Sequence, residues 1–188
     1  EASKLKKLRG RIIKFNPKLV NSNRYITLLG DGSLGGKGRG LAFLSNFIEN
    51  VYLKKLIPDL HVAIPKTAVI GVNEFDNFLE NNNLYDVIFE DKEYNHVLEA
   101  FRTARLSEQL RNNLRKYLQV MTKPLAVRFS GLFEDSLNQP FAGVYSTYLL
   151  PNNHPDIERR LEDVENAIKL VFASIYSPES RAYFNVID

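Results

Sequence analysis

The organisation of this chain follows from one stretch, Gly30-Asp31-Gly32-Ser33-Leu34-Gly35-Gly36-Lys37-Gly38-Arg39-Gly40. Six of its eleven residues are glycine, and it lies between the short apolar run 25–29 and an amphipathic segment. Glycine at this density permits positive φ angles and close approach of the backbone to a ligand, at an entropic cost. Lys37 stands in the middle, just where the helical pattern begins. Backbone amides, a helix N-terminus and a lysine together favour anions, so we expect a phosphate-binding loop.

Two known phosphate-loop patterns match this stretch incompletely. The dinucleotide fingerprint G-x-G-x-x-G fits from Gly30, but the acidic residue expected about 20 positions later would be Glu49, inside the helical segment. The P-loop pattern fails because Asp31 stands at its first glycine and Gly38 follows the lysine in place of Ser or Thr. From the loop alone, a glycine-rich linker stays an alternative to a ligand-binding loop.

Composition limits the class of protein. The 188 residues, 44% of them hydrophobic, can bury a core as one domain or two small lobes. No apolar run is long enough to cross a bilayer, so we expect no membrane partner. The absence of cysteine excludes disulfides and thiolate metal sites and suits a cytoplasmic protein. Because the chain begins with Glu1 and ends at Asp188 after a helical pattern, we expect it to be a piece of a longer polypeptide.

Positive charge is concentrated at the N-terminus. Residues 1–24 contain eight Lys or Arg and one Glu, whereas the whole chain has a net charge of only +3. Such a basic arm could bind nucleic acid. However, Phe15 is its only aromatic residue, and no recognised nucleic-acid-binding module follows it. We therefore favour a basic linker or arm over residues 1–25, or a surface docked on a neighbouring domain, and do not expect nucleic acid as a partner.

The hydrophobic pattern of the first half predicts alternating helices and strands. Apolar residues at helical spacing predict a helix over residues 37–52. Residues 67–72 have the composition of a buried strand, and Asn73 is a suitable N-cap for a helix over residues 74–80. Residues 84–120 predict two or three packed helices, with Ser107 and Glu108 as a helix-start signal, and we expect the role of these helices to be structural.

The second half predicts an antiparallel strand pair followed by helices. Residues 124–129 form a strand that ends in an arginine, and residues 144–149 alternate as a second strand across a long polar loop. Pro155 is suited to the first turn of a long amphipathic helix. A last helix is expected over residues 179–186.

The glycine stretch resembles a family signature. The sequence Gly-Gly-Lys-Gly-x-Gly-Leu-Ala from Gly35, followed by Ile-Pro at Ile64 and Val-Ile at Val69, resembles the start of the pyruvate phosphate dikinase and phosphoenolpyruvate synthase family. The resemblance predicts the glycine loop to be part of a nucleotide site.

Two later stretches are similar to the same family. Leu-Ala-Val-Arg-x-Ser from Leu125, Glu-Asp at Glu134, Phe-Ala-Gly from Phe141 and Tyr-x-Thr from Tyr145 resemble the second signature of its ATP-binding region. The tail Val-Phe-Ala-Ser from Val171, followed by Ala-Tyr at residues 182–183, is similar too. The motifs come in the family's order and cover residues 26–188, which we interpret as the N-terminal part of its ATP-binding domain.

The resemblance implies a fold and a set of site residues. The fold is α+β, the first lobe of an ATP-grasp nucleotide-binding domain, with a mixed or antiparallel sheet and packed helices. In the family the glycine-loop lysine and the strand-end arginine contact the ATP phosphates, and these are Lys37 and Arg128 here, the expected catalytic residues. A lysine supplies a compact charge, and a guanidinium holds two phosphate oxygens in a planar fork. The full set of expected phosphate-binding residues is Gly35, Gly36, Lys37, Gly38, Arg128, Ser130 and Gly143.

The sequence departs from the family's pattern just after Arg128. Phe129 occupies the first position of a usual Ser-Ser pair, Gly131 replaces a common alanine, and Leu132 stands where threonine is frequent. Phe129 and Leu132 cannot supply hydroxyl contacts, which leaves Ser130. The acidic pair at residues 134–135 matches the family, and we expect it to shape the loop rather than bind magnesium. Without the resemblance, a surface ion pair between Arg128 and Glu134 or Asp135 would be preferred.

The resemblance also implies an activity for the parent polypeptide. It would pass a phosphoryl group from ATP to a histidine and then to pyruvate, which gives phosphoenolpyruvate; whether water or phosphate is the second acceptor stays open. The Mg²⁺ ligands, the phosphohistidine domain and the pyruvate-binding barrel are expected downstream of this chain. The three histidines, His61, His96 and His154, lack the Thr-Ser-His context and metal-ligand spacing, so we expect no metal site here.

Two further expectations follow from this incomplete site. This piece alone should neither turn over ATP nor bind it tightly. The alternative function is a degenerate module that senses nucleotide or binds partners without phosphoryl transfer, for which Phe129 and Leu132 are the signs.

Overall fold

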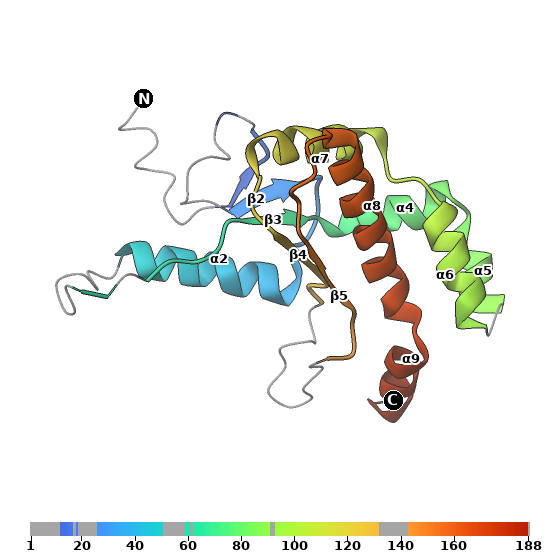
Figure 1. The fold of residues 1–188 in the computed structure, drawn as a ribbon. Helices are drawn as coiled ribbons and strands as arrows, with labels where there is room; N and C mark the ends of the chain where they lie inside the picture. The colour runs from blue at the N-terminus through green and yellow to red at the C-terminus, as the bar shows by residue number, and fades with distance from the viewer. Residues whose placement is uncertain are drawn as a thin grey trace.

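The computed structural model describes residues 12–16, 18, 26–50, 59–60, 62–90, 93–131 and 143–187. Its strands form two separate sheets (Figure 1): a parallel sheet of β1 (Ile12–Lys14), β2 (Ile26–Leu29) and β3 (Thr67–Ile70), and an antiparallel pair of β4 (Leu125–Arg128) and β5 (Thr147–Leu150). The helices are α2 (Gly35–Asn50), α4 (Val72–Asn81), α5 (Leu84–Glu90), α6 (Tyr94–Thr103), α7 (Glu108–Val120), α8 (Ile157–Ala173) and α9 (Pro178–Ile187), with a 3₁₀ turn, η1 (Ser174–Tyr176). The α+β class is confirmed.

The parallel sheet is built around β2. Ile26 and Leu29 are almost completely buried, and β2 pairs with β1 on one side and β3 on the other. The helix α2 connects β2 toward β3, as parallel neighbours require a crossover. In Figure 1, α2 lies on the left below this sheet, whereas α4, α5 and α6 lie on the right.

The N-terminal arm contributes to this sheet. Residues 1–25 were expected to form a basic linker or arm, yet Ile12–Lys14 form the edge strand β1, parallel to β2. The sequence signal was weak because this strand is short and lies among basic residues. Apart from residues 12–16 and 18, the arm lies outside the described residues.

The helix α8 organises the core. One face of it is buried, and it packs on α6 and α7 and on both strands of the antiparallel pair. Phe172 of α8 lies 5.5 Å, ring centroid to centroid, from Phe78 of α4, which in turn lies 5.5 Å from Phe101 of α6. Burial of such aromatic side chains is the main favourable contribution to folding.

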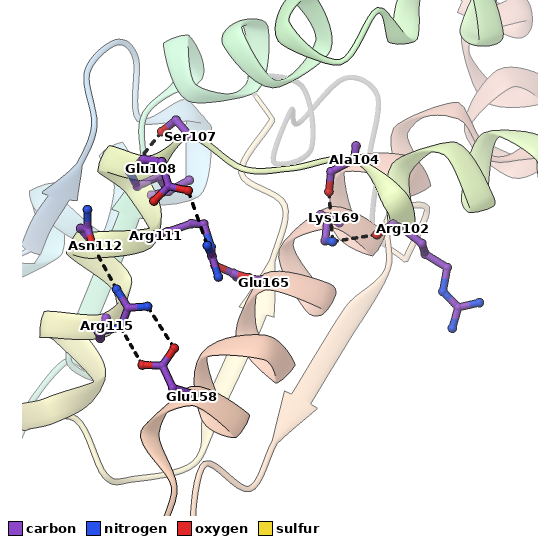
Figure 2. A network of polar contacts seen from close by, with 11 residues as sticks. Arg102, Ala104, Ser107, Glu108, Arg111, Asn112, Arg115, Glu158, Glu165 and Lys169 are labelled. Carbon is purple, nitrogen blue, oxygen red and sulfur yellow. Dashed lines mark hydrogen bonds and ion pairs between the residues drawn. The ribbon is translucent and has the colours of Figure 1, made fainter.

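Ion pairs join α7 to α8 along the edge of this core (Figure 2). Arg111 Nε lies 2.6 Å from Glu165 Oε1, and Arg115 donates two hydrogen bonds to the carboxylate of Glu158, at 2.7 and 3.0 Å. Lys169 of α8 donates hydrogen bonds to the carbonyls of Arg102 and Ala104 at the end of α6. The dipole of α6 favours a cation at this end of the helix.

The helix starts were predicted with mixed success. Ser107 is the N-cap of α7 and accepts a hydrogen bond from the Leu110 amide at 3.1 Å, as predicted. Asn73 was wrong as an N-cap, because α4 already begins at Val72 with Gly71 as its N-cap. Pro155 precedes the first turn of α8, whose N-cap is Asp156.

Other predictions agree with the structure more closely. The antiparallel pairing of the two late strands is confirmed, with Arg128 opposite Thr147. The last helix is confirmed as α9, which Pro178 begins. The helix after the glycine loop begins at Gly35, two residues earlier than predicted. No helix among the described residues has the length and hydrophobicity that a membrane crossing requires.

Candidate functional site

The glycine loop lies at the carboxyl edge of the parallel sheet. Gly30 follows the last residue of β2, Gly71 follows the last residue of β3, and Lys14 is the last residue of β1. This edge is where open parallel sheets place their ligands. The loop therefore occupies the position at which a ligand-binding segment is expected.

The first half of the loop is bound to the start of α4. The amide of Gly71 donates to Leu29 O at 3.0 Å, that of Val72 to Ser33 O at 3.1 Å, and that of Asn73 to Asp31 O at 3.2 Å. The loop carbonyls thus satisfy the first amides of α4, which otherwise lack partners within the helix. This explains why α4 begins without a side-chain cap.

Glu74 packs against the same half of the loop. This glutamate is only 8% exposed, and its Oε2 accepts a hydrogen bond from the Ser107 hydroxyl at 2.9 Å. Gly30 has a φ of +78°, and a Cβ there would lie 2.4 Å from Glu74 Cγ. Because glycine alone fits this contact without displacing the carboxylate, Gly30 and Glu74 fix the entry to the loop together.

The second half of the loop meets the segment that follows β4. The Gly36 amide donates to Gly131 O at 3.1 Å, and the Gly38 amide donates to the Ser130 hydroxyl at 3.0 Å. The Ser130 hydroxyl donates in turn to Leu34 O at 2.8 Å. Two motifs that lie more than ninety residues apart are therefore joined by direct hydrogen bonds.

The two predicted cations lie on these joined segments. Lys37 is half-buried in the first turn of α2, between the two glycines whose amides bind residues 130–131. Arg128 is exposed at the end of β4, two residues before Ser130. The structure therefore brings together the backbone segments that carry Lys37 and Arg128, and their contact with phosphate stays a prediction.

The predicted backbone cradle is satisfied by the protein itself. Gly35 N donates to Ser33 Oγ at 3.4 Å, and the amides of Gly36 and Gly38 bind Gly131 and Ser130 as described. A phosphate would have to compete with these acceptors for the amides. Gly143 has a φ of +84°, is exposed, and would meet no atom within 4 Å if it carried a Cβ, so no contact places it against the loop.

One site residue was missed by the sequence prediction. Lys14 Nζ lies 2.6 Å from Asp31 Oδ1, so the end of β1 pairs with the acidic side chain of the glycine loop. Both side chains are exposed, and such a pair contributes little stability. Its effect is on the charge of the loop, because it places a cation beside the loop's own carboxylate, which would repel a phosphate. Lys14 gave no separate signal within the basic arm.

Comparison with known protein families identifies this arrangement. The model of the pyruvate phosphate dikinase AMP/ATP-binding domain matches residues 31–186, most of the 188-residue chain. The chain belongs to this family. Comparisons with curated proteins and with solved structures found no match.

Membership in the dikinase family accounts for the joined motifs. The match begins inside the glycine loop and extends past Arg128 and β5 to α9, so both halves of the predicted site lie within the matched region. It supports ATP binding, as in a pyruvate phosphate dikinase-like enzyme. The predicted division into residues 1–25 and 26–188 stays a prediction.

Phe129 stands where the sequence resemblance leads us to expect a serine. The Phe129 ring packs on Tyr145 with centroids 4.4 Å apart and rings inclined by 54°. The side chain therefore packs against Tyr145, two residues before β5, instead of supplying a hydroxyl. Leu132 and the acidic pair at residues 134–135 lie outside the described residues.

The two histidines that the structure describes lie on other segments than the glycine loop and residues 128–131. His154 Nδ1 accepts a hydrogen bond from the Asp156 amide at 3.1 Å, and His96 lies in α6. His61 lies outside the described residues. Within the part of the chain that the structure describes, no three His, Cys, Asp or Glu side chains are grouped to hold a metal ion.

Proposed function

We propose that Lys37 and Arg128 bind the phosphates of ATP, in a phosphotransferase that passes a phosphoryl group from ATP to a histidine and then to pyruvate. The observation that carries this proposal is the direct bonding of the glycine loop to residues 130–131, which ties the Lys37 segment to the Arg128 segment. The family match supports the nucleotide. The pyruvate and the histidine domain are taken from the sequence resemblance.

The chemistry of phosphoryl transfer suits these two side chains. The reaction needs positioning and charge neutralisation more than covalent chemistry from the protein. Arg128 can hold two phosphate oxygens in its planar fork, and Lys37 supplies a compact charge at the N-terminus of α2, where the helix dipole also favours anions. Gly35 lets the two segments approach closely, because a Cβ there would lie 1.4 Å from Ser130 O. We assign Gly35, Gly36 and Gly38 to the phosphate site, and Gly143 on the sequence resemblance alone.

The binding of the magnesium ion and the later steps of the reaction are assigned from the sequence resemblance. Mg²⁺ would neutralise charge on the phosphates when bound, but the described residues offer no cluster of carboxylates to hold it. From the sequence resemblance we assign the Mg²⁺ ligands to another part of the parent polypeptide, and the binding and orientation of the phosphates to this chain. A cytoplasmic location, suggested by the absence of cysteine, belongs to the same proposal.

The phosphate contacts can be tested with the chain itself. Mg-ATP and inorganic tripolyphosphate would be titrated to millimolar concentration while backbone amide signals are followed by NMR. Lys37→Ala and Arg128→Ala should each weaken both ligands about tenfold or more, because a charge-assisted contact contributes about 1.5–3 kcal/mol. Lys123→Ala, at an exposed lysine just before β4, serves as the control. Unchanged affinities in both variants would remove these residues from the site.

A second candidate function is a nucleotide-binding module that performs no transfer. The packing of Phe129 against Tyr145, in place of a family serine, favours it. The two candidates differ in the fate of the phosphoryl groups of ATP. Incubation of the polypeptide that contains this chain with ATP and pyruvate gives phosphorylated protein and phosphoenolpyruvate under the first candidate. Binding of ATP without either product favours the second.

A further inference from the structure

Ser130 occupies an unusual place between the two motifs. Its hydroxyl accepts a hydrogen bond from the Gly38 amide at 3.0 Å and donates one to the Leu34 carbonyl at 2.8 Å. These two partners are one helical turn apart at the start of α2. A serine from the segment after β4 therefore spans the first turn of the helix that carries Lys37.

This contact bridges the first turn of α2 with a hydroxyl from a distant segment. In a helix that begins at Gly35, the Leu34 carbonyl is the regular i−4 acceptor of the Gly38 amide. Ser130, which is 92 residues from Gly38, accepts a hydrogen bond from this amide and donates one to this carbonyl. The segment after β4 is therefore bonded into the first turn of the helix.

The backbones on either side of Ser130 approach closely as well. Gly36 N donates to Gly131 O at 3.1 Å, and a Cβ on Gly35 would lie 1.4 Å from Ser130 O. Gly35 has a φ of +68°, which other residues rarely adopt. Glycine at position 35 therefore leaves room for the Ser130 carbonyl. The Ser130 hydroxyl then fixes how the start of α2 aligns with the segment after β4.

We propose that Ser130 is a positioning residue, which fixes the Lys37 turn against the end of the Arg128 strand. The inference rests on the proposed function, because it concerns the same phosphate site. The only hydroxyl proton of Ser130 is directed to Leu34 O, so a bond from this hydroxyl to a phosphate would break the bridge. Ser130 therefore acts through Lys37 and Arg128, whose charges must converge on one ligand.

The bridge itself is tested without any ligand. Amide hydrogen exchange at Gly38 would be measured by NMR in the unsubstituted chain, Ser130→Ala, Ser130→Thr and the control Ser146→Ala. Ser146 lies in the same region and takes part in bonding to Ser174 through its backbone amide. We expect exchange at Gly38 to become about tenfold faster in Ser130→Ala alone, since the hydroxyl that holds the first turn of α2 against residue 130 is lost. Unaltered exchange would overturn the bridge.

The positioning role is tested by titration of the same variants with tripolyphosphate. Ser130→Ala should weaken tripolyphosphate binding about tenfold. Ser130→Thr should bind tripolyphosphate as the unsubstituted chain does, because threonine keeps the hydroxyl. In the Ser130→Ala background, Lys37→Ala and Arg128→Ala should each have a smaller effect than in the unsubstituted chain, since the two cations no longer act together.

Each contrary outcome has a distinct meaning. A lower midpoint of thermal unfolding with unchanged tripolyphosphate affinity would reduce Ser130 to a stabilising residue and overturn the positioning role. Weaker binding with unchanged Gly38 exchange would make Ser130 a direct phosphate ligand, which also overturns it. Equal losses in Ser130→Ala and Ser130→Thr would show that the hydroxyl is not responsible. Failure of the unsubstituted chain to bind either Mg-ATP or tripolyphosphate would instead contradict the proposed function, and the positioning role with it.

Discussion

At the scale of single residues, Arg160 shows how a buried charge can stabilise a fold without an acidic partner. This arginine of α8 is only 8% exposed. Its guanidinium donates to the carbonyls of Leu118 and Met121 at the end of α7, and to Asn152 Oδ1 at 2.8 Å. The carbonyls at a helix C-terminus carry partial negative charge, so they take the place of a carboxylate.

We expect Arg160→Met to destabilise the chain by about 3 kcal/mol, because it leaves several buried acceptors without a donor. The free energy of unfolding would be measured by urea denaturation monitored by circular dichroism. Arg159→Met is the matched control, since Arg159 is exposed on the same helix and pairs only with Glu162 one turn away; we expect it to change stability by less than about 0.5 kcal/mol. Equal effects of the two substitutions would contradict this role of Arg160.

At the scale of elements, the pairing of α7 with α8 depends on pH. The Arg115 guanidinium, which hydrogen-bonds to Glu158, holds the pKa of that carboxyl below its usual value of 4.5. The unfolded chain therefore takes up this proton before the folded chain does. The stabilisation is present above pH 4.5 and is lost as the pH falls through the lowered pKa.

The Glu158→Gln variant should therefore lose less stability on acidification than the unsubstituted chain. Urea denaturation between about pH 7 and about pH 3 would measure the difference. Glu162→Gln is the control, because its ion pair with Arg159 lies within α8 and joins no second helix. Parallel stability curves for the unsubstituted chain and Glu158→Gln would show that this ion pair does not stabilise the α7–α8 contact.

The elements were predictable from sequence where local signals decide them. The apolar stripe of α8 and the Ser107 cap depend on neighbouring residues, and β4 and β5 each have a recognisable strand pattern and follow one another along the chain. The edge strand β1 could not be predicted, because three residues in a basic stretch become a strand only by pairing with β2. The start of α4 depends likewise on carbonyls of the glycine loop, which no pattern around Asn73 reveals.

The site follows the same division between local and distant contacts. The composition of the glycine loop indicated phosphate binding, whereas Arg128 alone indicated only a surface ion pair. The resemblance to the dikinase family was needed to predict that both belong to one site. Three contacts around the glycine loop were not predictable from sequence. They are the packing of Glu74 on Gly30, the ion pair of Lys14 with Asp31, and the bonding of Ser130 to the start of α2. Each depends on how distant segments pack, which spacing along the chain does not encode.

At the scale of the whole molecule, two tyrosines report on folding from different parts of the structure. Tyr117 packs with Met121 in a small cluster that contacts Ala68 of the parallel sheet, and Tyr176 packs on Phe101 in the helical core. Burial raises the pKa of each phenol to about 12, from an ordinary value of 10.0. The folded chain therefore keeps these two protons through a pH range in which the unfolded chain releases them.

The chain should consequently lose stability as the pH rises from 10.0 through about 12. We expect Tyr117→Phe and Tyr176→Phe each to lessen this alkaline loss, because phenylalanine keeps the packing and has no proton to release. Urea denaturation across this pH range would measure the effect, with Tyr183→Phe of α9 as the control. If the chain unfolds as one cooperative unit, either substitution shifts the whole transition, since burial at one site stabilises every part of a two-state structure. A shift seen in only one portion of the transition would instead show that the sheet side and the helical core unfold separately.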